Sequence, residues 1–443
     1  GRADADTSLT IAMDAFSDCN HLENITGGYR VSEVGWYAFD SCVNLKNMDI
    51  GMGLKKIDAA FERCRSLRKI CLSNKIEDIN GGAFSEGACK EFSVEDGSES
   101  YKSIDGCLYK IVDSEKDNLK LMYAANTTDF KYATPENVTE ADMCAFRGRD
   151  NIKEIDIGGE IEELSWYSLI NCSNLETLKL SSKLKSFDRD MTAYSFDNDL
   201  TNLKNIIVDE GNTEYESYNN ELFEKGKKNL ILLPYGSDSI VIPKETEYIC
   251  GGIAKNKFKN IKVEDGNKYF SVNSNVLYNK DITEIIIFPS YKTTYTLPAT
   301  LKEFPSMTYR YTEDYLDIEG EAWITRADEN LECVKVAKGN EVYKAVDGVL
   351  YLKNTKQLEY YPPAKKGSYK IIEGTKYVNN AAFIYTKYLT SLTVPDSVKS
   401  IIISPKDSES LKEITVPVKC EVIKMTKREG SGVKVYRSLV LKC

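Results

Sequence analysis

The sequence predicts a strand-rich solenoid, in which short repeats stack along one axis. The first observation is a phrase that occurs at Ala38-Phe39 and again at Ala60-Phe61. Each Ala-Phe pair is followed by Cys, then by Leu, then by a short apolar run. The second is a longer segment, with a turn pair before an apolar-aromatic pair, that occurs in four copies. Recurrence at a fixed spacing of about 22 residues is typical of stacked repeat proteins.

The length of the chain is consistent with this fold class. At 443 residues the chain is too long for one ordinary compact core. Repeat proteins escape that limit because each unit packs only on its neighbours, so the core grows along one axis. We therefore expect a single continuous solenoid over residues 1–420. Residues 421–443 indicate a C-terminal hairpin that caps the last hydrophobic repeat.

The clearest repeats lie at the N-terminal end. Each apolar run alternates at period two, which predicts a short half-buried strand. The Ala-Phe segment predicts a short helical or irregular return leg whose Phe fills the core, and glycines between the legs suit tight corners. Four Ala-Phe pairs follow one another at steps of 23, 22 and 23 residues: Ala15-Phe16, Ala38-Phe39, Ala60-Phe61 and Ala83-Phe84.

The longer segments predict β-hairpins inserted into the solenoid. The second residue of each turn pair is Gly or Asn, the residue types that accept the positive φ of a tight hairpin turn. The turn pairs are Asp105-Gly106, Asn219-Asn220, Ser274-Asn275 and Asp347-Gly348. The inserts are expected near residues 94–124, 208–234, 263–289 and 336–362.

Several of the twelve cysteines recur at one position of the repeat. These are Cys19, Cys42, Cys64 and Cys172, and no C-x-x-C motif occurs that would favour a zinc ribbon or a thioredoxin-like site. Equivalent positions on stacked coils form a row, so we expect small buried thiols packed in a ladder. Disulfides between neighbouring coils are the alternative, although the spacing of coils need not suit disulfide geometry.

These units carry a family resemblance. AFDSCVNLKNMDI at residues 38–50 resembles the BspA-type (Treponema-type) leucine-rich repeat, and the DGVLY hairpin at residues 347–351 resembles inserts of that family. The likeness covers roughly residues 9–420, although Ser168-Leu169 replaces Ala-Phe in one unit. The resemblance implies a leucine-rich-repeat solenoid. It also implies an exported or surface-attached protein, of bacteria or some parasitic protists, that is adhesive or of unknown role.

Charge and hydropathy exclude some classes of protein. The formal net charge is −10, whereas a nucleic-acid binder should show a basic excess. No apolar run is long enough to span a bilayer. The N-terminus lacks a basic region followed by an apolar one, so we expect no signal peptide within this sequence. We expect a secreted or cell-surface protein whose export signal has already been removed.

The sequence offers little for catalysis. His21 is the single histidine, which leaves almost no basis for His-based catalysis or a multi-His metal site. No Gly-rich phosphate loop and no calcium loop occurs. A carboxylate pair cannot be picked out from spacing alone. We therefore predict no enzymatic activity, no cofactor and no metal.

The middle residue of each strand should point outward and form a docking row. The candidate residues are Asp156, Lys179, Lys262 and Lys335, and the other members are Asp49, Cys71, Ile207, Thr393 and Thr415. Solenoids bind partners through such extended surfaces. The alternative is a plain solvated sheet face without a partner.

Residues 299–330 break the repeat and hold the densest aromatic cluster. Its members are Tyr309, Tyr311, Tyr315 and Trp323. Tyr and Trp are favoured at interfaces because they are flat, stiff and amphipathic. They are candidate ligand-binding residues. The alternative is that they cover the core where the repeats break down.

Three functions remain open on this basis. The first is a non-enzymatic, adhesin-like protein that binds a host or bacterial surface protein. The second is a glycan-binding accessory protein of the cell envelope that uses the aromatic cluster. The third is a purely structural surface component.

Overall fold

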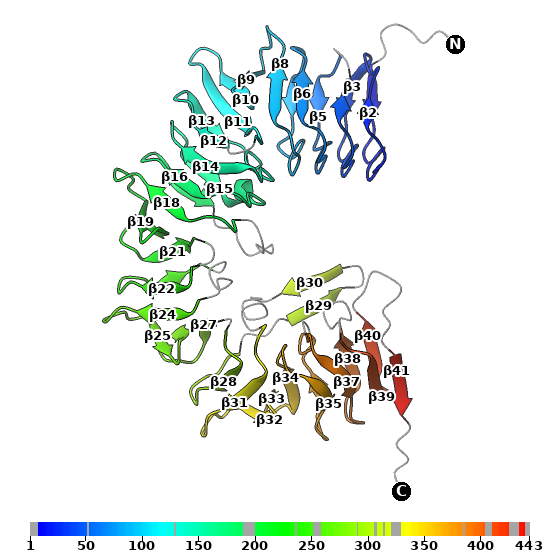
Figure 1. Cartoon of the computed structure of the whole chain (residues 1–443), viewed down its shortest axis with the longest axis vertical. Coiled ribbons are helices and arrows are strands. Elements are labelled where there is room, and N and C mark those ends of the chain that lie inside the picture. Colours follow the sequence, from blue (N-terminus) through cyan, green and yellow to red (C-terminus); the bar gives the residue numbers. More distant parts are fainter. Residues whose placement is uncertain are drawn as a thin grey trace. The chain divides into compact units, whose positions relative to one another are not determined.

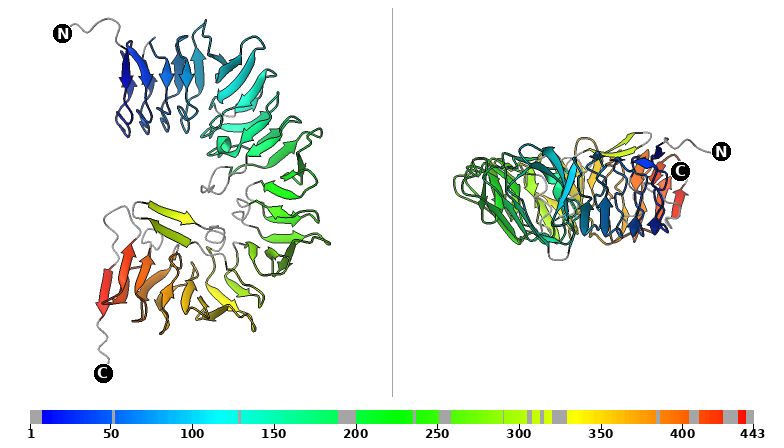
Figure 2. Two further views of the ribbon diagram at one scale, coloured as in Figure 1. Left: turned by 180° about the vertical axis from the view of Figure 1, so that it is seen from behind. Right: turned by 90° about the horizontal axis from the view of Figure 1, so that it is seen from above.

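The protein is a strand-rich solenoid with almost no helix. The chain divides into two compact units, Gly1–Tyr235 and Gly236–Cys443. Figure 1 labels strands of both units. The computed structural model describes residues 8–50, 53–127, 130–188, 200–234, 237–250, 258–289, 291–304, 308–312, 315–319, 329–383, 386–403, 410–424 and 434–438. The predicted leucine-rich-repeat solenoid is confirmed, and the strands of each unit stack side by side in chain order (Figure 2).

Each coil of unit 1 carries one strand on each side of the core, and strands of successive coils pair in parallel. The first side holds β1 (Leu9–Ile11), β3 (Val31–Val34), β5 (Lys56–Ile57) and β7 (Asp78–Ile79), then β13 (Val138–Ala141), β15 (Glu163–Ser165) and β17 (Ser186–Asp188). The second side holds β2 (Asn24–Ile25) with β4 (Asn47–Met48), β6 (Lys69–Leu72) with β8 (Glu91–Val94), and a four-stranded sheet of β12 (Phe130–Ala133), β14 (Ile152–Ile157), β16 (Thr177–Leu180) and β18 (Asn205–Val208).

Unit 2 follows the same plan. Its second side holds β22 (Ser239–Ile242) with β24 (Asn260–Val263), β28 (Thr294–Leu297) with β31 (Cys333–Val336), and a sheet of β35 (Gly367–Lys370), β37 (Leu389–Thr393), β39 (Glu413–Pro417) and β41 (Lys434–Ser438). The remaining strands outside the inserts are β23 (Tyr248–Ile249), β36 (Tyr377–Val378), β38 (Ser400–Ile403) with β40 (Glu421–Lys424), and the antiparallel pair β29 (Thr308–Thr312) and β30 (Tyr315–Glu319).

The return legs are turns rather than helices. Among the described residues only η1 (Trp166–Leu169), a 3₁₀ helix, is helical. The Phe rings of the first four coils stack in a ladder, with centroids 5.1 Å apart for Phe16 and Phe39, 5.1 Å for Phe39 and Phe61, and 5.6 Å for Phe61 and Phe84. The expected role of Phe as core filler is therefore confirmed.

The residue two positions after the Phe (or its Leu equivalent) turns the chain in every described return leg of this type in unit 1. It adopts a left-handed conformation, with φ of 56° at Asp18, 57° at Ser41, 57° at Arg63, 52° at Glu86, 73° at Gly148 and 61° at Asn171. Such a conformation is costly for most non-glycine side chains, so the coils that carry Ser41, Arg63 and Glu86 at this corner store a small strain.

Each insert is a three-stranded meander, and the predicted hairpin turns are confirmed. Both residues of every turn pair have positive φ, from 50° at Asp105 to 75° at Gly106. The inserts are β9 (Tyr101–Ile104), β10 (Cys107–Asp113) and β11 (Asn118–Tyr123); β19 (Tyr215–Tyr218), β20 (Glu221–Glu224) and β21 (Asn229–Leu232); β25 (Phe270–Asn273), β26 (Val276–Asn279) and β27 (Ile285–Ile287); β32 (Tyr343–Val346), β33 (Val349–Leu352) and β34 (Gln357–Tyr360).

The third strand of an insert returns to the stack. β11 pairs in parallel with β13, and β34 pairs in parallel with β36. The first two strands contribute to the core as well, since Leu108 and Tyr109 of β10 and Tyr351 of β33 are buried.

The C-terminal strands differ from the expected hairpin over residues 421–443. β40 pairs in parallel with β38, and β41 pairs in parallel with β39, so these two strands do not pair with each other. They occupy the two sides of a further coil. The alternating apolar runs were correctly placed, but period-two alternation does not distinguish a hairpin strand from a solenoid strand.

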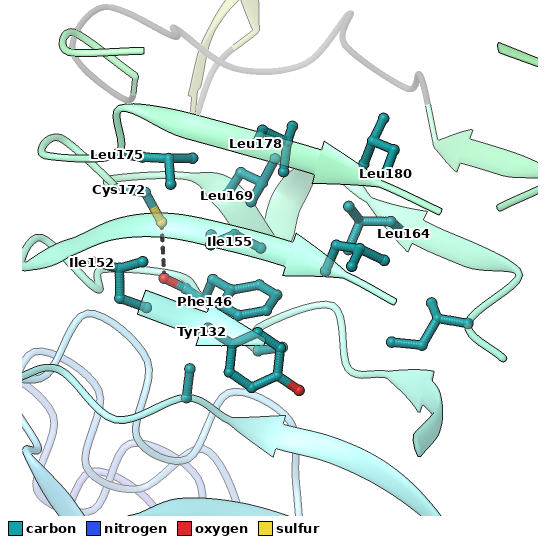
Figure 3. Close-up of a cluster of buried hydrophobic side chains, with 14 of the residues drawn as sticks. Tyr132, Phe146, Ile152, Ile155, Leu164, Leu169, Cys172, Leu175, Leu178 and Leu180 are labelled. Atoms are coloured by element: carbon teal, nitrogen blue, oxygen red, sulfur yellow. Dashed lines mark hydrogen bonds between the residues drawn. The ribbon is translucent and has the colours of Figure 1, made fainter. Parts of the chain in front are cut away.

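The core lies between the two sides and is built from repeated aliphatic positions. Figure 3 shows part of it, where Phe146, Ile155 and Leu178 pack together. Each of the three is fully buried.

Candidate functional site

The outward face of the β12–β14–β16–β18 sheet brings two of the predicted row residues together. Asp156 of β14 pairs with Lys179 of β16, which in turn pairs with Ile207 of β18. Strand alternation places these residues on the face opposite the core positions Ile155, Leu178 and Ile206. This sheet face is called the outward face below.

The charges of the outward face are partly satisfied within it. Glu154 accepts Lys179 Nζ at 2.6 Å and Lys131 Nζ at 3.2 Å, and Lys179 Nζ lies 3.7 Å from Asp156. The hydrogen bond from Lys179 is the main reason that the pKa of Glu154 lies below its usual value. Ile207 ends the row as an apolar side chain that is 46% exposed.

The other predicted row residues lie in unit 2. Lys262 pairs with Val241 in the β22–β24 sheet, and Lys335 pairs with Thr296 in the β28–β31 sheet. Both are exposed, as expected for the middle of a strand. They do not share a sheet with each other, because the insert formed by β25, β26 and β27 separates their coils.

Three residues of the predicted aromatic cluster lie on an antiparallel pair of strands. Tyr309 and Tyr311 lie two residues apart on β29, and Tyr315 begins β30. The register pairs Tyr309 with Ile318, Tyr311 with Leu316 and Thr312 with Tyr315, so no two of the tyrosines are directly opposite. Trp323 lies outside the described residues. A ligand-binding role of these four residues stays a prediction.

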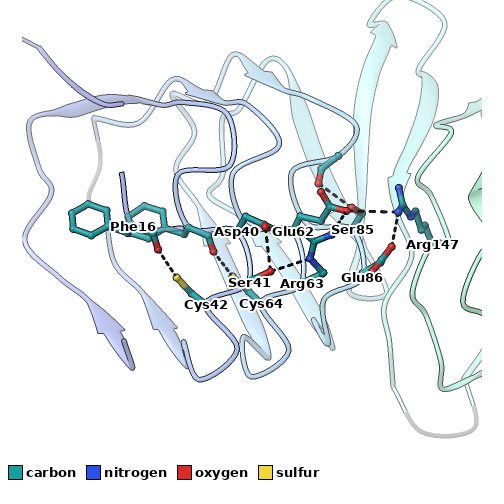
Figure 4. Close-up of polar contacts among 12 residues, drawn as sticks. Phe16, Asp40, Ser41, Cys42, Glu62, Arg63, Cys64, Ser85, Glu86 and Arg147 are labelled. Carbon is teal, nitrogen blue, oxygen red and sulfur yellow. Dashed lines mark hydrogen bonds and ion pairs between the residues drawn. The ribbon is translucent and has the colours of Figure 1, made fainter. Parts of the chain in front are cut away.

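A second polar feature runs along the return legs of unit 1 (Figure 4). Arg63 binds Asp40 at 2.6 Å and Glu62 at 3.4 Å, and Arg147 binds Glu86 at 2.5 Å and lies 3.7 Å from Glu62. The residues one and two positions after each Phe supply these groups, because coils stack in register. Burial is the main cause that raises the pKa of Glu62.

This network joins the return legs that lie before and after the first insert in sequence. Glu86 N donates to Arg147 O, so two return legs 61 residues apart in sequence lie side by side. The approach is so close that a Cβ on Gly148 would lie 2.3 Å from Glu86 Cα, and Gly148 has a φ of 73°. Only glycine fits this position without a backbone shift.

Arg149 connects the two coils that the first insert separates in sequence. It stands three residues after Phe146, the position that Cys42 and Cys64 occupy in earlier coils. Its guanidinium is fully buried and donates to Ala124 O at 2.8 Å, to Gly87 O at 3.0 Å and to Phe84 O at 3.4 Å. Burial is the main reason that its pKa is lowered. Sequence analysis missed this residue, although its place in the cysteine row was visible.

The cysteine row itself forms a ladder of thiols. Cys42 Sγ donates to Phe16 O at 3.1 Å, Cys64 Sγ to Phe39 O at 3.2 Å, and Cys172 Sγ to Phe146 O at 3.0 Å. All cysteines of the described part of the chain are free, so the disulfide alternative is wrong there. Cys19 departs from expectation because it is exposed: among described residues, no coil packs on that side of it.

Three inserts begin with a buried Asn that joins neighbouring coils. Asn267 Nδ2 donates to Pro243 O at 2.8 Å and to Thr246 O at 3.0 Å, and its Oδ1 accepts the N–H groups of Tyr269 and Phe270. Asn212 and Asn340 make the same pattern. The recurring Gly-Asn pair was the sequence signal for this element.

The described part of the chain offers neither a metal cluster nor a membrane-spanning helix. No group of three or more His, Cys, Asp and Glu side chains there could hold a metal ion. No helix there is long and apolar enough to cross a membrane.

Comparison with known proteins identifies the repeat. Six copies of the BspA type leucine-rich repeat region match residues 5–110, 123–229 and 365–427, which is more than half of the chain. No curated protein matches the sequence.

Solved structures of bacterial repeat proteins also resemble the chain. A leucine-rich repeat protein from Eubacterium ventriosum is 14% identical, with 94% of this chain and 85% of that chain covered and a TM-score of 0.38. The pneumococcal vaccine antigen PcpA is 16% identical, with 98% and 85% covered and a TM-score of 0.29. A leucine-rich repeat protein from Bacteroides ovatus is 15% identical, with 94% and 78% covered and a TM-score of 0.26. The repeat match alone carries the assignment: the chain belongs to the BspA-type leucine-rich-repeat family.

Proposed function

We propose that this chain is a non-enzymatic, exported cell-surface protein that binds another protein in an adhesin-like manner through the outward face. Membership of the repeat family supports a binding role, because solenoids use extended sheet surfaces to engage partners. Lys262 and Lys335 occupy the corresponding strand positions of unit 2, and we propose a binding role for them within that unit.

The observation that carries the proposal is the exposed Ile207 in register with Lys179 and Asp156. Outward strand positions of a solvated sheet are usually polar. An apolar β-branched residue beside a charged pair gives the composition of a protein interface, with an apolar anchor and a polar rim.

The proposal is tested with a triple variant, Asp156→Lys, Lys179→Glu and Ile207→Asp. Wild type and variant are passed over a panel of purified extracellular-matrix proteins and bacterial surface proteins, and binding is followed by biolayer interferometry. We expect the wild type to bind at least one member, and the variant to bind it at least about tenfold more weakly, which corresponds to about 1.4 kcal/mol.

The matched control is the double variant Glu162→Lys and Lys185→Glu. Glu162 and Lys185 form an exposed ion pair at 2.5 Å beside the β15–β17 side of the same coils. Equal binding by the triple variant and the control would rule out the outward face. A wild type that binds no member of the panel would count against the adhesin-like role.

A further inference from the structure

The exposed side chains of the outward face form two rows across its four strands. Strand pairing aligns Lys131, Glu154, Thr177 and Asn205 in the first row, and Ala133, Asp156, Lys179 and Ile207 in the second row. None of these eight residues is buried. Ile155 and Leu178 point from the same strands into the core (Figure 3), so the two rows lie on the opposite side of the sheet.

A third row borders the face where the strands begin, and its charges alternate. Lys153 Nζ lies 3.6 Å from the Glu176 carboxylate, and Lys204 Nζ lies 3.0 Å from the same carboxylate. In the second row, Lys179 Nζ lies 3.7 Å from the Asp156 carboxylate. β14 therefore carries a base in the third row and an acid in the second row, and β16 carries the reverse.

This pattern is self-complementary about a twofold axis that runs parallel to the strands, between β14 and β16. Such an axis sets β14 of one copy against β16 of a second copy, and β12 against β18. Asp156 then faces Lys179 of the second copy. In the same way Lys153 faces Glu176 of the second copy, and each of these contacts occurs twice.

The apolar residue of the face also meets a suitable partner in this arrangement. Ile207 on β18 is 46% exposed, and it faces Ala133 on β12 of the second copy. In the first row, the Glu154 carboxylate faces the Thr177 hydroxyl of the second copy, which is a hydrogen-bond donor. Neither of the first two rows then holds two like charges opposite each other.

The other possible twofold axis of a face-to-face pair is unfavourable. An axis across the strands, between the first and second rows, would set Glu154 against Asp156 of the second copy, and like charges in contact oppose association. With the axis parallel to the strands, β14 and β16 lie next to it. Asp156 and Lys179 therefore stay opposite each other when two sheets pack at the angle of about 30° that their twist produces.

The size of the face indicates a weak contact between single copies. Four strands spaced by about 4.8 Å, with three rows along them, give a face of about 14 Å by about 14 Å. A standard interface buries about 800 Å² of each partner, which is several times this area. Single copies therefore pair weakly, whereas many copies displayed on two opposing surfaces gain strength by multivalency.

We propose that the partner of the outward face is a second copy of this chain on an opposing surface, so that the protein mediates homophilic adhesion. The inference rests on the proposed function, because it names the protein that the same face binds. The contact of Asp156 with Lys179 orients the two copies, and Ile207 supplies the apolar contact. The ion pairs of the two copies then join into one network of four charged groups.

The test uses beads of two colours, each coated with the full chain through a C-terminal tag, and flow cytometry to count mixed clumps at physiological salt. We expect wild-type beads to clump. Asp156→Lys and Lys179→Glu, each alone, should lower clumping at least fivefold, because each change sets like charges opposite each other. The control Lys185→Glu reverses an exposed charge beside the β15–β17 side of the same coils and should clump like the wild type.

Mixtures of variants separate a symmetric contact from a loss of binding for another reason. Asp156→Lys beads should clump with Lys179→Glu beads, because opposite charges then meet at both positions. The double variant Asp156→Lys/Lys179→Glu should clump with itself but not with the wild type. The same outcomes are expected for Lys153→Glu and Glu176→Lys, which take over if a variant of the first pair fails to fold.

Failure of this inference is distinct from failure of the proposed function. Wild-type beads that stay single, single variants that clump like the wild type, or a mixture that does not recover would each overturn the second copy as the partner. The panel of other proteins is measured separately, so a panel member that binds through the outward face would still support the proposed function. Recovery of clumping in the mixture supports both.

Discussion

One residue position, three places after the core Phe or Leu, ties several return legs of unit 1 to the preceding leg. Where the two return legs belong to adjacent coils, a thiol makes the contact, as Cys64 does by donating to Phe39 O. Where an insert separates the two return legs in sequence, Arg149 makes the contact, because its longer side chain reaches Phe84 O and Gly87 O. The same position thus takes a small or a large donor according to the gap.

The thiol ladder predicts which cysteines react. Burial raises the pKa of Cys64 and of Cys144 to about 12, so neither thiolate is populated at neutral pH. Cys19 and Cys71 are exposed. Brief treatment of the native protein with iodoacetamide, followed by peptide mass spectrometry, should label Cys19 and Cys71 and spare Cys64 and Cys144. Labelling of Cys64 at a rate similar to Cys71 would contradict the buried ladder.

Replacement of Arg149 should be among the most damaging single changes. Arg149→Met leaves three carbonyl oxygens without their donor, and each unsatisfied buried group costs about 1–3 kcal/mol. We expect the free energy of unfolding to fall by about 3 kcal/mol or more in urea titrations. Arg65→Met, at an exposed position of another return leg, should change it by less than about 0.5 kcal/mol. Similar values for both variants would show that the carbonyl contacts contribute little.

Glu221 predicts a pH dependence of stability. It is 7% exposed, its Oε2 has no hydrogen-bond partner, and burial raises its pKa from 4.5 to about 8. Equivalent positions of other inserts hold Cys107, Val276 and Val349. Because the folded state holds this proton more tightly, its contribution is complete below pH 4.5 and is lost as pH rises towards 8, by up to about 1.4 kcal/mol per pH unit.

The measurement compares wild type with Glu221→Val by urea unfolding at pH 5 and pH 8. The variant should be more stable at both, and its advantage should grow with pH. An advantage that shrinks between pH 5 and pH 8 would mean that the carboxylate is stabilised as an anion.

At the level of the element, three inserts are fastened to the next coil by a buried pair of tyrosines. The hydroxyl oxygens of Tyr278 and Tyr295 are 2.7 Å apart, and those of Tyr351 and Tyr369 are 2.6 Å apart. The first insert has the same arrangement, with Tyr109 and Tyr132 at 3.5 Å. In the second insert the equivalent sequence positions hold apolar residues, Phe223 and Ile240, and both are buried. Each insert therefore has either both tyrosines of the pair or neither.

A double-mutant cycle on Tyr278 and Tyr295 should reveal this coupling. Each single Tyr→Phe change leaves the other buried hydroxyl without its partner and should cost about 1–2 kcal/mol. The double variant should cost less than the sum of the two, because no polar group is then left unsatisfied. Additive losses in thermal unfolding would indicate that the two hydroxyl groups find other partners.

At the level of the whole molecule, a solenoid transmits a defect only to its neighbours. Phe61→Ala removes one ring from the ladder and should destabilise its coil by about 3–5 kcal/mol. We expect faster amide hydrogen exchange in the coils near residue 61, while β37 and β39 of the second unit keep their wild-type protection. Uniform loss of protection over both units would show that the chain unfolds as one cooperative body.

The sequence predicted most of the repeat, but few of the contacts that join coils on either side of an insert. The Ala-Phe pairs and the turn pairs such as Asp347-Gly348 are local signals, because each depends on residues a few positions apart. Arg149 and the Glu86–Arg147 contact depend on residues about 61 positions apart that meet only once the insert has looped out. The outward position of Asp156 and Lys179 was predictable from alternation. The separation of Lys262 from Lys335 was not, because it depends on where inserts interrupt the sheets.

The return of the third insert strand to the stack has a consequence for how such a chain can change. β11 and β34 continue the parallel pairing with β13 and β36, and the first hairpin turn is tied to the preceding coil, because Phe92 N donates to Gly106 O at 2.9 Å. The turn between β10 and β11, residues 114–117, is instead exposed. Additions should therefore be tolerated at that turn, and a foreign epitope grafted there would be displayed without shifting the phase of any coil.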